Sequence, residues 1–174
     1  MRIISGIYKG RVLKSPSGNK AIRPTTDRAR ETLFNILANR MNFENKICLD
    51  LFCGTGSFGF EFLSRGGSKC TFVDRDIRVI KKNAEMLKPT GDIKIIRDDA
   101  IHFLISQKDN ESDIAFADPP YSYKKYENLL NEMSKYKTLF ILEHDKSLMD
   151  FNQYKNNIIL QKKIGISFFS FFEF

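Results

Sequence analysis

The sequence predicts an α/β fold built on a mostly parallel β-sheet with helices on both faces. Short apolar, β-prone runs alternate with amphipathic helical segments from about residue 46 to residue 143. A glycine-rich turn follows the first of these runs, and two further β-prone runs with only Gly165 between them end the chain. Strand–helix alternation requires parallel strands that are covered on both faces. With 174 residues, 42% of them hydrophobic, the chain suffices for one core and one main domain.

The order of the elements narrows the fold class. Strands are predicted near residues 46–52, 69–74, 92–97, 112–117 and 138–143, and helices near 57–66, 76–88, 99–107 and 124–135. The last two runs, 157–164 and 166–173, are too close together for a crossover helix, so they should pair antiparallel at the end of the sheet. Five alternating units with a closing hairpin match the Rossmann-like class I methyltransferase architecture. An ordinary dinucleotide-binding domain would continue with parallel strands.

The N-terminal segment has a different pattern. Two β-prone runs, 2–6 and 10–14, flank three residues and predict a β-hairpin. Thr25 or Thr26 is placed to cap a helix that continues to about Arg40. The predicted organisation is therefore a basic β-hairpin extension over residues 1–22, followed by a class I methyltransferase domain over residues 23–174.

The positive charge is concentrated in the same segment. The chain carries a net charge of +7, and residues 1–30 alone account for it, with eight Lys and Arg side chains against the single acid Asp27. A basic arm on a neutral domain indicates a polyanion partner, with nucleic acid the leading choice. A solvated basic tail remains the alternative. The predicted RNA-binding residues are Arg2, Lys9, Arg11, Arg23 and Arg28.

The glycine-rich turn predicts a nucleotide-type cofactor site. Gly54, Gly56 and Gly59 form a G-x-G-x-x-G pattern after the first strand, where glycines permit a tight turn and a close approach of the backbone to a ligand. Asp74 ends the next strand, 20 residues after Gly54, and is placed to accept hydrogen bonds from ribose hydroxyls. These features fit NAD as well as S-adenosylmethionine.

Two further acids favour S-adenosylmethionine. Asp50 directly precedes the loop, where it would attract a cationic methionine group and repel a pyrophosphate. Asp99 ends the third predicted strand, placed to accept from an adenine amine, although a helix cap explains Asp99 equally well. The predicted cofactor-binding set is Asp50, Phe52, Gly54, Gly56, Asp74, Asp99 and Ala100.

The stretch Asp118, Pro119, Pro120 and Tyr121 follows the fourth predicted strand and carries the catalytic prediction. Two prolines make the loop rigid, so a carboxylate, backbone carbonyls and an aromatic ring are held in a fixed relation. Acceptors beside a stacking surface suit the exocyclic amine of a nucleobase. The four residues resemble the D/N-P-P-Y/F signature of S-adenosylmethionine-dependent amino-methyltransferases. A plain proline turn is the alternative.

A longer resemblance covers nearly the whole chain. Residues 23–35 resemble the R-P-T-x-x-R-x-R-E-x-L-F-N segment of RsmD-type 16S ribosomal RNA methyltransferases. The G-x-x-x-G-R run from Gly6 to Arg11, the L-D-L-F-x-G-x-G-x-x-G-x-E loop ending at Glu61, the D-P-P-Y loop and the hairpin at Gly165 extend it. The resemblance implies methyl transfer to the exocyclic N2 amine of one guanine in the small subunit. It also implies that the N-terminal hairpin engages RNA.

The remaining expectations follow from this interpretation. The partner is 16S ribosomal RNA or the assembled 30S subunit, and the protein is expected to be a cytoplasmic monomer without a metal or a membrane span. Three cysteines lack metal-ligand spacing and are too few for a disulfide framework. His102 and His144 are expected to be structural. A DNA adenine N6 methyltransferase and a non-catalytic RNA-binding module on a methyltransferase fold remain as alternatives.

Overall fold

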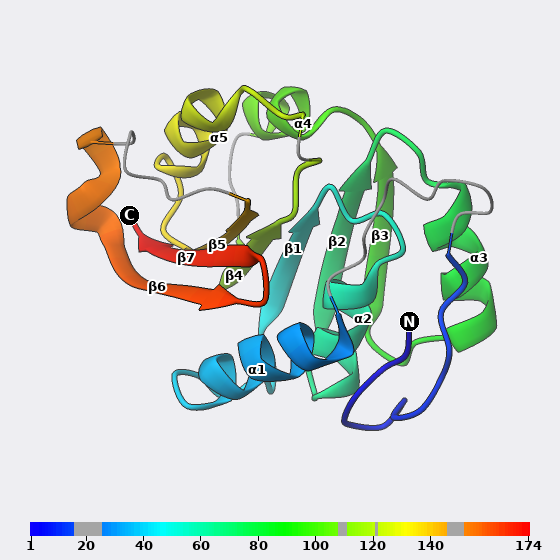
Figure 1. Cartoon of the computed structure of the whole chain (residues 1–174). Coiled ribbons are helices and arrows are strands. Elements are labelled where there is room, and N and C mark those ends of the chain that lie inside the picture. Colours follow the sequence, from blue (N-terminus) through cyan, green and yellow to red (C-terminus); the bar gives the residue numbers. More distant parts are fainter. Residues whose placement is uncertain (16–25, 108–110, 121, 146–151) are drawn as a thin grey trace.

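The computed structural model describes residues 1–15, 26–107, 111–120, 122–145 and 152–174. Its centre is a seven-stranded sheet in the order β3-β2-β1-β4-β5-β7-β6 (Figure 1). The strands are β1 Ile47–Leu51, β2 Lys69–Asp74, β3 Asp92–Arg97, β4 Ile114–Ala117, β5 Leu139–His144, β6 Ile158–Ile164 and β7 Ser167–Glu173. The first five strands are parallel, and β7 pairs antiparallel with both β5 and β6. The predicted parallel sheet with a closing hairpin is confirmed.

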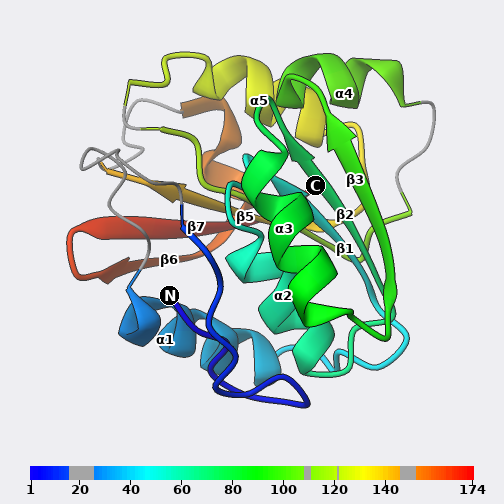
Figure 2. The same ribbon diagram turned by 90° about the vertical axis from the view of Figure 1, so that its right-hand side faces the viewer.

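Five α-helices cover the two faces of the sheet. They are α1 Asp27–Ala38, α2 Ser57–Ser64, α3 Arg78–Leu87, α4 Ala100–Ser106 and α5 Tyr126–Met133, and a short 3-10 helix that was not predicted, η1 Asn152–Asn157, precedes β6. Of the two candidate caps for α1, Thr26 accepts a hydrogen bond from the Ala29 N–H at 3.2 Å, and Thr25 lies outside the described residues. Helices α1, α2 and α3 lie on one face, and α4 and α5 on the other (Figure 2).

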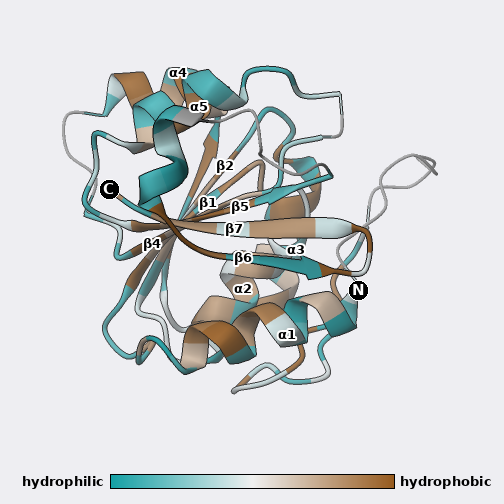
Figure 3. Ribbon diagram, turned by 60° about the vertical axis from the view of Figure 1, so that its left-hand side comes forward, coloured by the Kyte–Doolittle hydropathy of each residue, from teal (hydrophilic) through white to brown (hydrophobic). Residues whose placement is uncertain are grey.

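Side chains alternate between the two faces of the sheet along each strand, so the core consists of two apolar clusters, one on each face. Phe116 of β4 and Ile141 of β5 belong to the cluster beneath α1–α3, whereas Ala117 and Leu142, one residue later, belong to the cluster beneath α4 and α5. The middle strands are therefore hydrophobic on both faces, while the edge strand β6 has a hydrophilic stretch (Figure 3). That stretch includes exposed Lys162 and Lys163, and charged side chains on an edge strand oppose pairing with other chains.

The N-terminal arm, residues 1–15, has the antiparallel pairing of the predicted β-hairpin but not its regular strands. A single antiparallel bridge joins Arg2 to Val12, and the arm contains no regular strand. The backbone N–H groups of Ile4 and Ser5 donate instead to the buried carboxylate of Glu61 in α2, at 2.6 and 3.0 Å. Backbone hydrogen bonds join the two sides of the arm, from Ile3 N–H to the Arg11 carbonyl and from Leu13 N–H to the Met1 carbonyl, both at 2.9 Å. The Ile4 and Ser5 N–H groups bind the helix side chain and do not extend this ladder.

The arm also packs into the main core. Ile3 and Leu13 are 1% and 2% exposed and belong to the apolar cluster beneath α1–α3. Gly6 lies so close to the end of α2 that a Cβ atom there would stand 1.7 Å from the Ser64 carbonyl oxygen. The arm is therefore held against the helices. The predicted boundary at residue 22 lies outside the described residues and stays a prediction.

Candidate active site

The carboxyl ends of neighbouring parallel strands bring most predicted site residues to one edge of the sheet. Leu51 in β1 pairs with Val73 in β2 on one side and with Ala117 in β4 on the other. The next residues along these strands are Phe52, Asp74 and Asp118. Open α/β sheets bind ligands at this edge, on either side of the point where the strand order reverses. Here that point lies between β1 and β4.

Asp74 fixes the glycine loop. One of its carboxylate oxygens accepts a hydrogen bond from the Gly54 N–H at 2.9 Å, and the other accepts from the Asp76 N–H at 2.9 Å. A carboxylate has about four acceptor sites, so two backbone donors leave capacity for further hydroxyl donors. The side chain is partly exposed at the strand end. These contacts suit the predicted role of Asp74 toward a ribose, which stays a prediction.

The loop between β1 and α2 has an unusual backbone. Phe52 adopts φ 54° and Gly56 φ 76°, and a positive φ is strained for a phenylalanine. A Cβ atom at Gly56 would come within 2.0 Å of Ile80 and 2.8 Å of Phe60. Gly56 is therefore required by packing against α2 and α3, whatever ligand the loop holds.

Asp50 is more deeply placed than the sequence implies. It is 1% exposed, and its carboxylate accepts a hydrogen bond from the Gly59 N–H at 3.0 Å. Burial raises the pKa of Asp50 to about 8, against the hydrogen bond from Gly59, which lowers it. The structure thus places Asp50 beneath the loop, as an anchor for α2. A contact with a bound methionine group stays a prediction.

Asp99 caps α4. Its Oδ1 accepts from the backbone N–H groups of Ile101 and His102 at 3.0 and 3.2 Å, and its Oδ2 pairs with Arg75 at 2.6 Å. The helix-cap interpretation of Asp99 is thus confirmed, while adenine binding by Asp99 and by buried Ala100 stays a prediction.

Asp118 stands one residue beyond β4 and is flanked by other acids. Burial raises its pKa well above the ordinary carboxyl range, and the charges of Glu143 and Asp50 add to that shift. Pro119 is buried, Pro120 is exposed, and the Pro120 carbonyl accepts from the Tyr123 N–H at 2.7 Å, which closes the loop. Tyr121 lies outside the described residues, so its stacking role stays a prediction.

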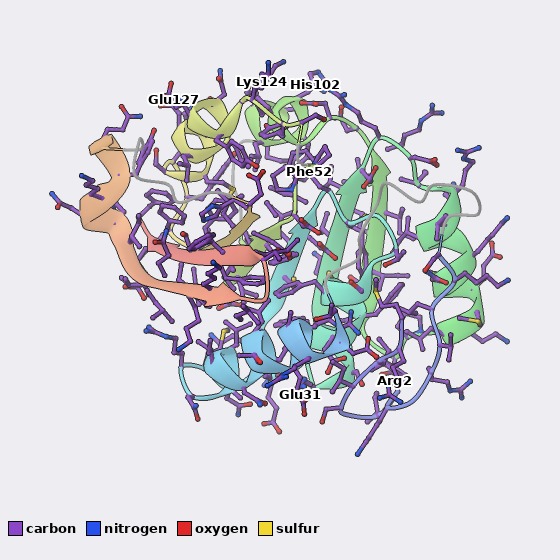
Figure 4. The ribbon with its side chains drawn as sticks, in the orientation of Figure 1. Arg2, Glu31, Phe52, His102, Lys124 and Glu127 are labelled. Carbon is purple, nitrogen blue, oxygen red and sulfur yellow. The ribbon has the colours of Figure 1, made fainter. Side chains whose placement is uncertain are left out.

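Tyr123 is a site residue that the sequence analysis missed. Its ring packs edge-on against Phe52, with centroids 5.1 Å apart, and Phe52 lies above the end of β1 in Figure 4. The Tyr123 hydroxyl is buried and has no hydrogen-bond partner among the described residues. Burial raises the pKa of Tyr123 to about 12, and the charge of Asp99 adds to the shift. A buried hydroxyl without a partner, beside the strand ends, is a group that a bound ligand would satisfy.

The predicted RNA-binding residues lie on the arm and on α1. Lys9, Arg11 and Arg28 are exposed, whereas the exposed Arg2 pairs with Asp27 at 3.1 Å. Arg23 lies outside the described residues. The arm spans α2 from end to end, because Met1 Sδ accepts from the Thr55 hydroxyl at 3.5 Å and the Ile7 N–H donates to the Ser64 carbonyl at 2.8 Å. The eight residues of α2 span about 12 Å, so the turn of the arm that carries Lys9 lies well away from the glycine loop.

Other kinds of site find no support in the part of the chain that the structure describes. It contains no group of three or more His, Cys, Asp or Glu residues able to hold a metal ion. None of its helices is long and apolar enough to cross a membrane. Cys48, Cys53 and Cys70 are buried free thiols.

A hollow of about 340 Å³ beside Asp74 is lined by Arg75, Asp76, Ile77, Arg78 and Arg97 and does not include the glycine loop.

The sheet order, with five parallel strands and the reversed β7, together with the glycine loop between β1 and α2, defines a class I methyltransferase fold. The family described as Conserved hypothetical protein 95 matches residues 1–173. The chain belongs to this family, and the resemblance predicted from its motifs is confirmed.

Individual relatives and solved structures are consistent with this family assignment. The chain is 39% identical over 158 residues to "Putative rRNA methyltransferase YlbH" of Bacillus subtilis, with 85% of this chain and 84% of the relative covered. It is 34% identical to "Ribosomal RNA small subunit methyltransferase D" of Haemophilus influenzae, with coverage of 95% and 90%. Among solved structures, "Putative methyltransferase yhhF from Escherichia coli" superposes with a TM-score of 0.82 at 32% identity, covering 99% of this chain and 97% of that one.

Proposed function

We propose that this protein transfers a methyl group from S-adenosylmethionine to the exocyclic N2 amine of a guanine in 16S ribosomal RNA. One observation carries the proposal. The Asp74-anchored glycine loop and the Asp118-Pro119-Pro120 loop lie at adjoining strand ends, which supports a cofactor site next to an amine site. The names of the relatives, ribosomal RNA methyltransferases at 34–39% identity, support the choice of RNA as the acceptor.

The residues present fit S-adenosylmethionine. Asp74 retains acceptor capacity for ribose hydroxyls, and the Tyr123 hydroxyl is a buried group with no partner among the described residues at the same edge. When bound, S-adenosylmethionine supplies a methyl group on a cationic sulfur, and that carbon passes to N2 while the sulfur keeps the bonding electrons. Asp50 and Phe52 complete the cofactor side of the site in this proposal.

The protein's part in the reaction is mainly positioning. Asp118 and the Pro119 carbonyl accept hydrogen bonds from the target amine, which aims its lone pair at the methyl carbon and stabilises the charge that develops on N2. The proton that N2 loses after transfer passes to the carboxylate of Asp118 or to water. Tyr121 stacks on the extruded base, an interaction of about 1–3 kcal/mol that offsets part of the unstacking cost.

The basic arm holds the RNA outside the site. Lys9 and Arg11 on the arm and Arg28 on α1 contact phosphates, while the strand ends receive the base. Because the arm is fixed to α2 by Glu61 and Ser64, the distance between its tip and the glycine loop is set by the fold. In this proposal the protein acts in the cytoplasm as a monomer, and its substrate is 16S RNA or the assembled 30S subunit.

Transfer of tritium from labelled S-adenosylmethionine tests this proposal. The acceptors are 30S subunits, deproteinised 16S RNA and DNA, all prepared from cells that lack the protein. Label in the ribosomal acceptors supports the proposal. Label in DNA alone identifies a DNA methyltransferase, and RNA binding without label in any acceptor identifies a non-catalytic binding module.

A further inference from the structure

The buried carboxylate of Glu143 belongs to β5, the strand next to the one that leads into Asp118. β4 and β5 are parallel neighbours in which Phe116 pairs with Ile141 and Ala117 with Leu142. Phe116 and Ile141 both point into the apolar cluster beneath α1–α3. Side chains alternate along a strand, so Glu143, two residues after Ile141, points to that same side of the sheet, where Asp118 follows Phe116 by two residues. Adjacent strands are about 4.8 Å apart, which brings the two carboxylates within reach of one ligand.

The surroundings of Glu143 set it apart from surface acids. It is 5% exposed, and its register partner on β7 is the fully buried Phe169. The charge of Glu143 raises the pKa of Asp118, after the larger effect of burial, which places the two groups in one electrostatic environment. The methyl transfer proposed above uses Asp118 as its carboxyl group and leaves Glu143 without a role.

Two adjacent carboxylates match guanine and mismatch adenine. The Watson–Crick edge of guanine presents two neighbouring donors, the N1–H and the N2 amine. The corresponding edge of adenine presents one amine donor beside N1, which is an acceptor. An ionised Glu143 only accepts hydrogen bonds, so it favours the N1–H of guanine and repels the N1 lone pair of adenine, whereas Asp118 can accept from an amine through a carboxyl oxygen in either protonation state. Extruded bases are commonly recognised by hydrogen bonds to this edge.

We propose that Glu143 accepts the N1–H of the target guanine while Asp118 accepts from its N2 amine, so that the pair selects guanine. This inference rests on the proposed methyl transfer to N2 and names the residue that determines the base. The same contact raises the electron density of the ring and so assists attack by the N2 amine.

A base analogue separates recognition of N1 from recognition of the amine. 2-Aminopurine keeps the exocyclic amine at C2 but has an unprotonated N1. Small subunits are reconstituted with 16S RNA that carries either guanine or 2-aminopurine at the position that the wild-type enzyme methylates. Single-turnover methylation is then measured for the wild type, Glu143→Gln and the matched control Glu132→Gln. Glu132 is a largely buried acid of α5 that pairs with Lys135 at 2.6 Å, and α5 covers the face of the sheet opposite to the one that Glu143 faces.

The wild type should methylate guanine about 10- to 100-fold faster than 2-aminopurine, the effect of one hydrogen bond to a charged group. In Glu143→Gln the side-chain amide donates to the unprotonated N1, so the guanine preference should fall by roughly tenfold. Glu132→Gln should keep the wild-type preference. A wild-type enzyme with equal rates on both bases overturns the inference, and so does a folded Glu143→Gln variant with an unchanged preference.

The folding of Glu143→Gln is checked by thermal melting. If this variant does not fold, the wild-type preference between the two bases decides the matter alone, because that measurement needs no variant. Absence of wild-type methylation on guanine-containing subunits contradicts the proposed function itself. That outcome is distinct from methylation of both bases at equal rates.

Discussion

The side chain of Asn83 in α3 forms a reciprocal pair of hydrogen bonds with the backbone of Lys14 in the N-terminal arm. Asn83 Oδ1 accepts from the Lys14 N–H at 2.8 Å, and Asn83 Nδ2 donates to the Lys14 carbonyl at 3.0 Å. The same Nδ2 also donates to the carbonyl of Thr55 in the glycine loop at 2.9 Å. One fully buried amide thus joins the arm to the loop that is proposed to hold the cofactor.

Replacement of Asn83 by alanine should lower the free energy of unfolding by about 1–3 kcal/mol, because buried backbone groups on two segments lose their partner. Urea unfolding measures this change. Asn131→Ala, at an exposed position on α5, is the matched control and should stay within about 0.5 kcal/mol of the wild type. Equal stabilities for the two variants would mean that the arm is held by its other contacts.

The raised pKa of Asp50 predicts that the protein loses stability as the pH rises from about 4 to about 8. Its pKa is raised to about 8 in the folded protein by burial, compared with about 3.9 in an unfolded chain. Its contribution is therefore fully present below about pH 4 and is lost as the pH rises through about 8. Urea unfolding between pH 5 and pH 9 should show this decline in the wild type. In Asp50→Asn, which keeps an acceptor for the Gly59 N–H, the decline should be smaller. An equal decline of the free energy of unfolding with pH in both proteins would refute the raised pKa of Asp50.

The exposed basic side chains of the arm predict that the affinity of the protein for RNA depends on salt. Lys9→Gln combined with Arg11→Gln should weaken binding to 16S RNA and reduce the slope of log K against log salt, because two phosphate contacts are lost. These two positions are better suited than Arg2, which already pairs with Asp27. Lys81→Gln with Lys82→Gln, exposed on α3, gives the same change of charge and should leave the slope closer to that of the wild type. If the two double variants behave alike, the arm acts only through the net charge.

Two substitutions of Tyr121 should separate the contribution of its aromatic ring from that of its hydroxyl group. Tyr121→Phe keeps the aromatic face and should retain most of the single-turnover rate. Tyr121→Ala should lose about 1–3 kcal/mol of transition-state stabilisation, the energy of one stacked base. A plain proline turn predicts instead that the activity of both variants follows their folded fraction, which thermal melts measure alongside the rates.

The sheet was predictable because its signals are local. Each apolar run, each intervening helix and the glycine turn can be recognised within a dozen residues, and the single glycine before Ile166 excludes a crossover helix. The arm was not predictable in detail. Its conformation depends on Glu61, Ser64 and Asn83, which are 56 to 69 residues away in the sequence. Those contacts stop the ladder that begins between residues 1–3 and residues 11–13.

The candidate site was also predictable only where its signals are local in the sequence. Asp74 ends an apolar strand and Asp118 follows one, and both were found from that pattern. The sequence offered a helix cap and an adenine contact for Asp99, and the geometry of α4 was needed to confirm the cap. Glu143 was missed because its neighbour Asp118 is 25 residues away on another strand. Its signal was present, since it is an acid directly after the apolar run 139–142.

The identity of the methylated nucleoside tests the central claim most directly. Small subunits from cells that lack the protein are incubated with S-adenosylmethionine and either the wild type or Asp118→Ala, and their RNA is digested to nucleosides for mass spectrometry. The wild type should produce N2-methylguanosine, and a folded Asp118→Ala variant that still binds the cofactor should produce almost none. Formation of a different methylated nucleoside, or an unchanged yield of N2-methylguanosine with the Asp118→Ala variant, would contradict the account.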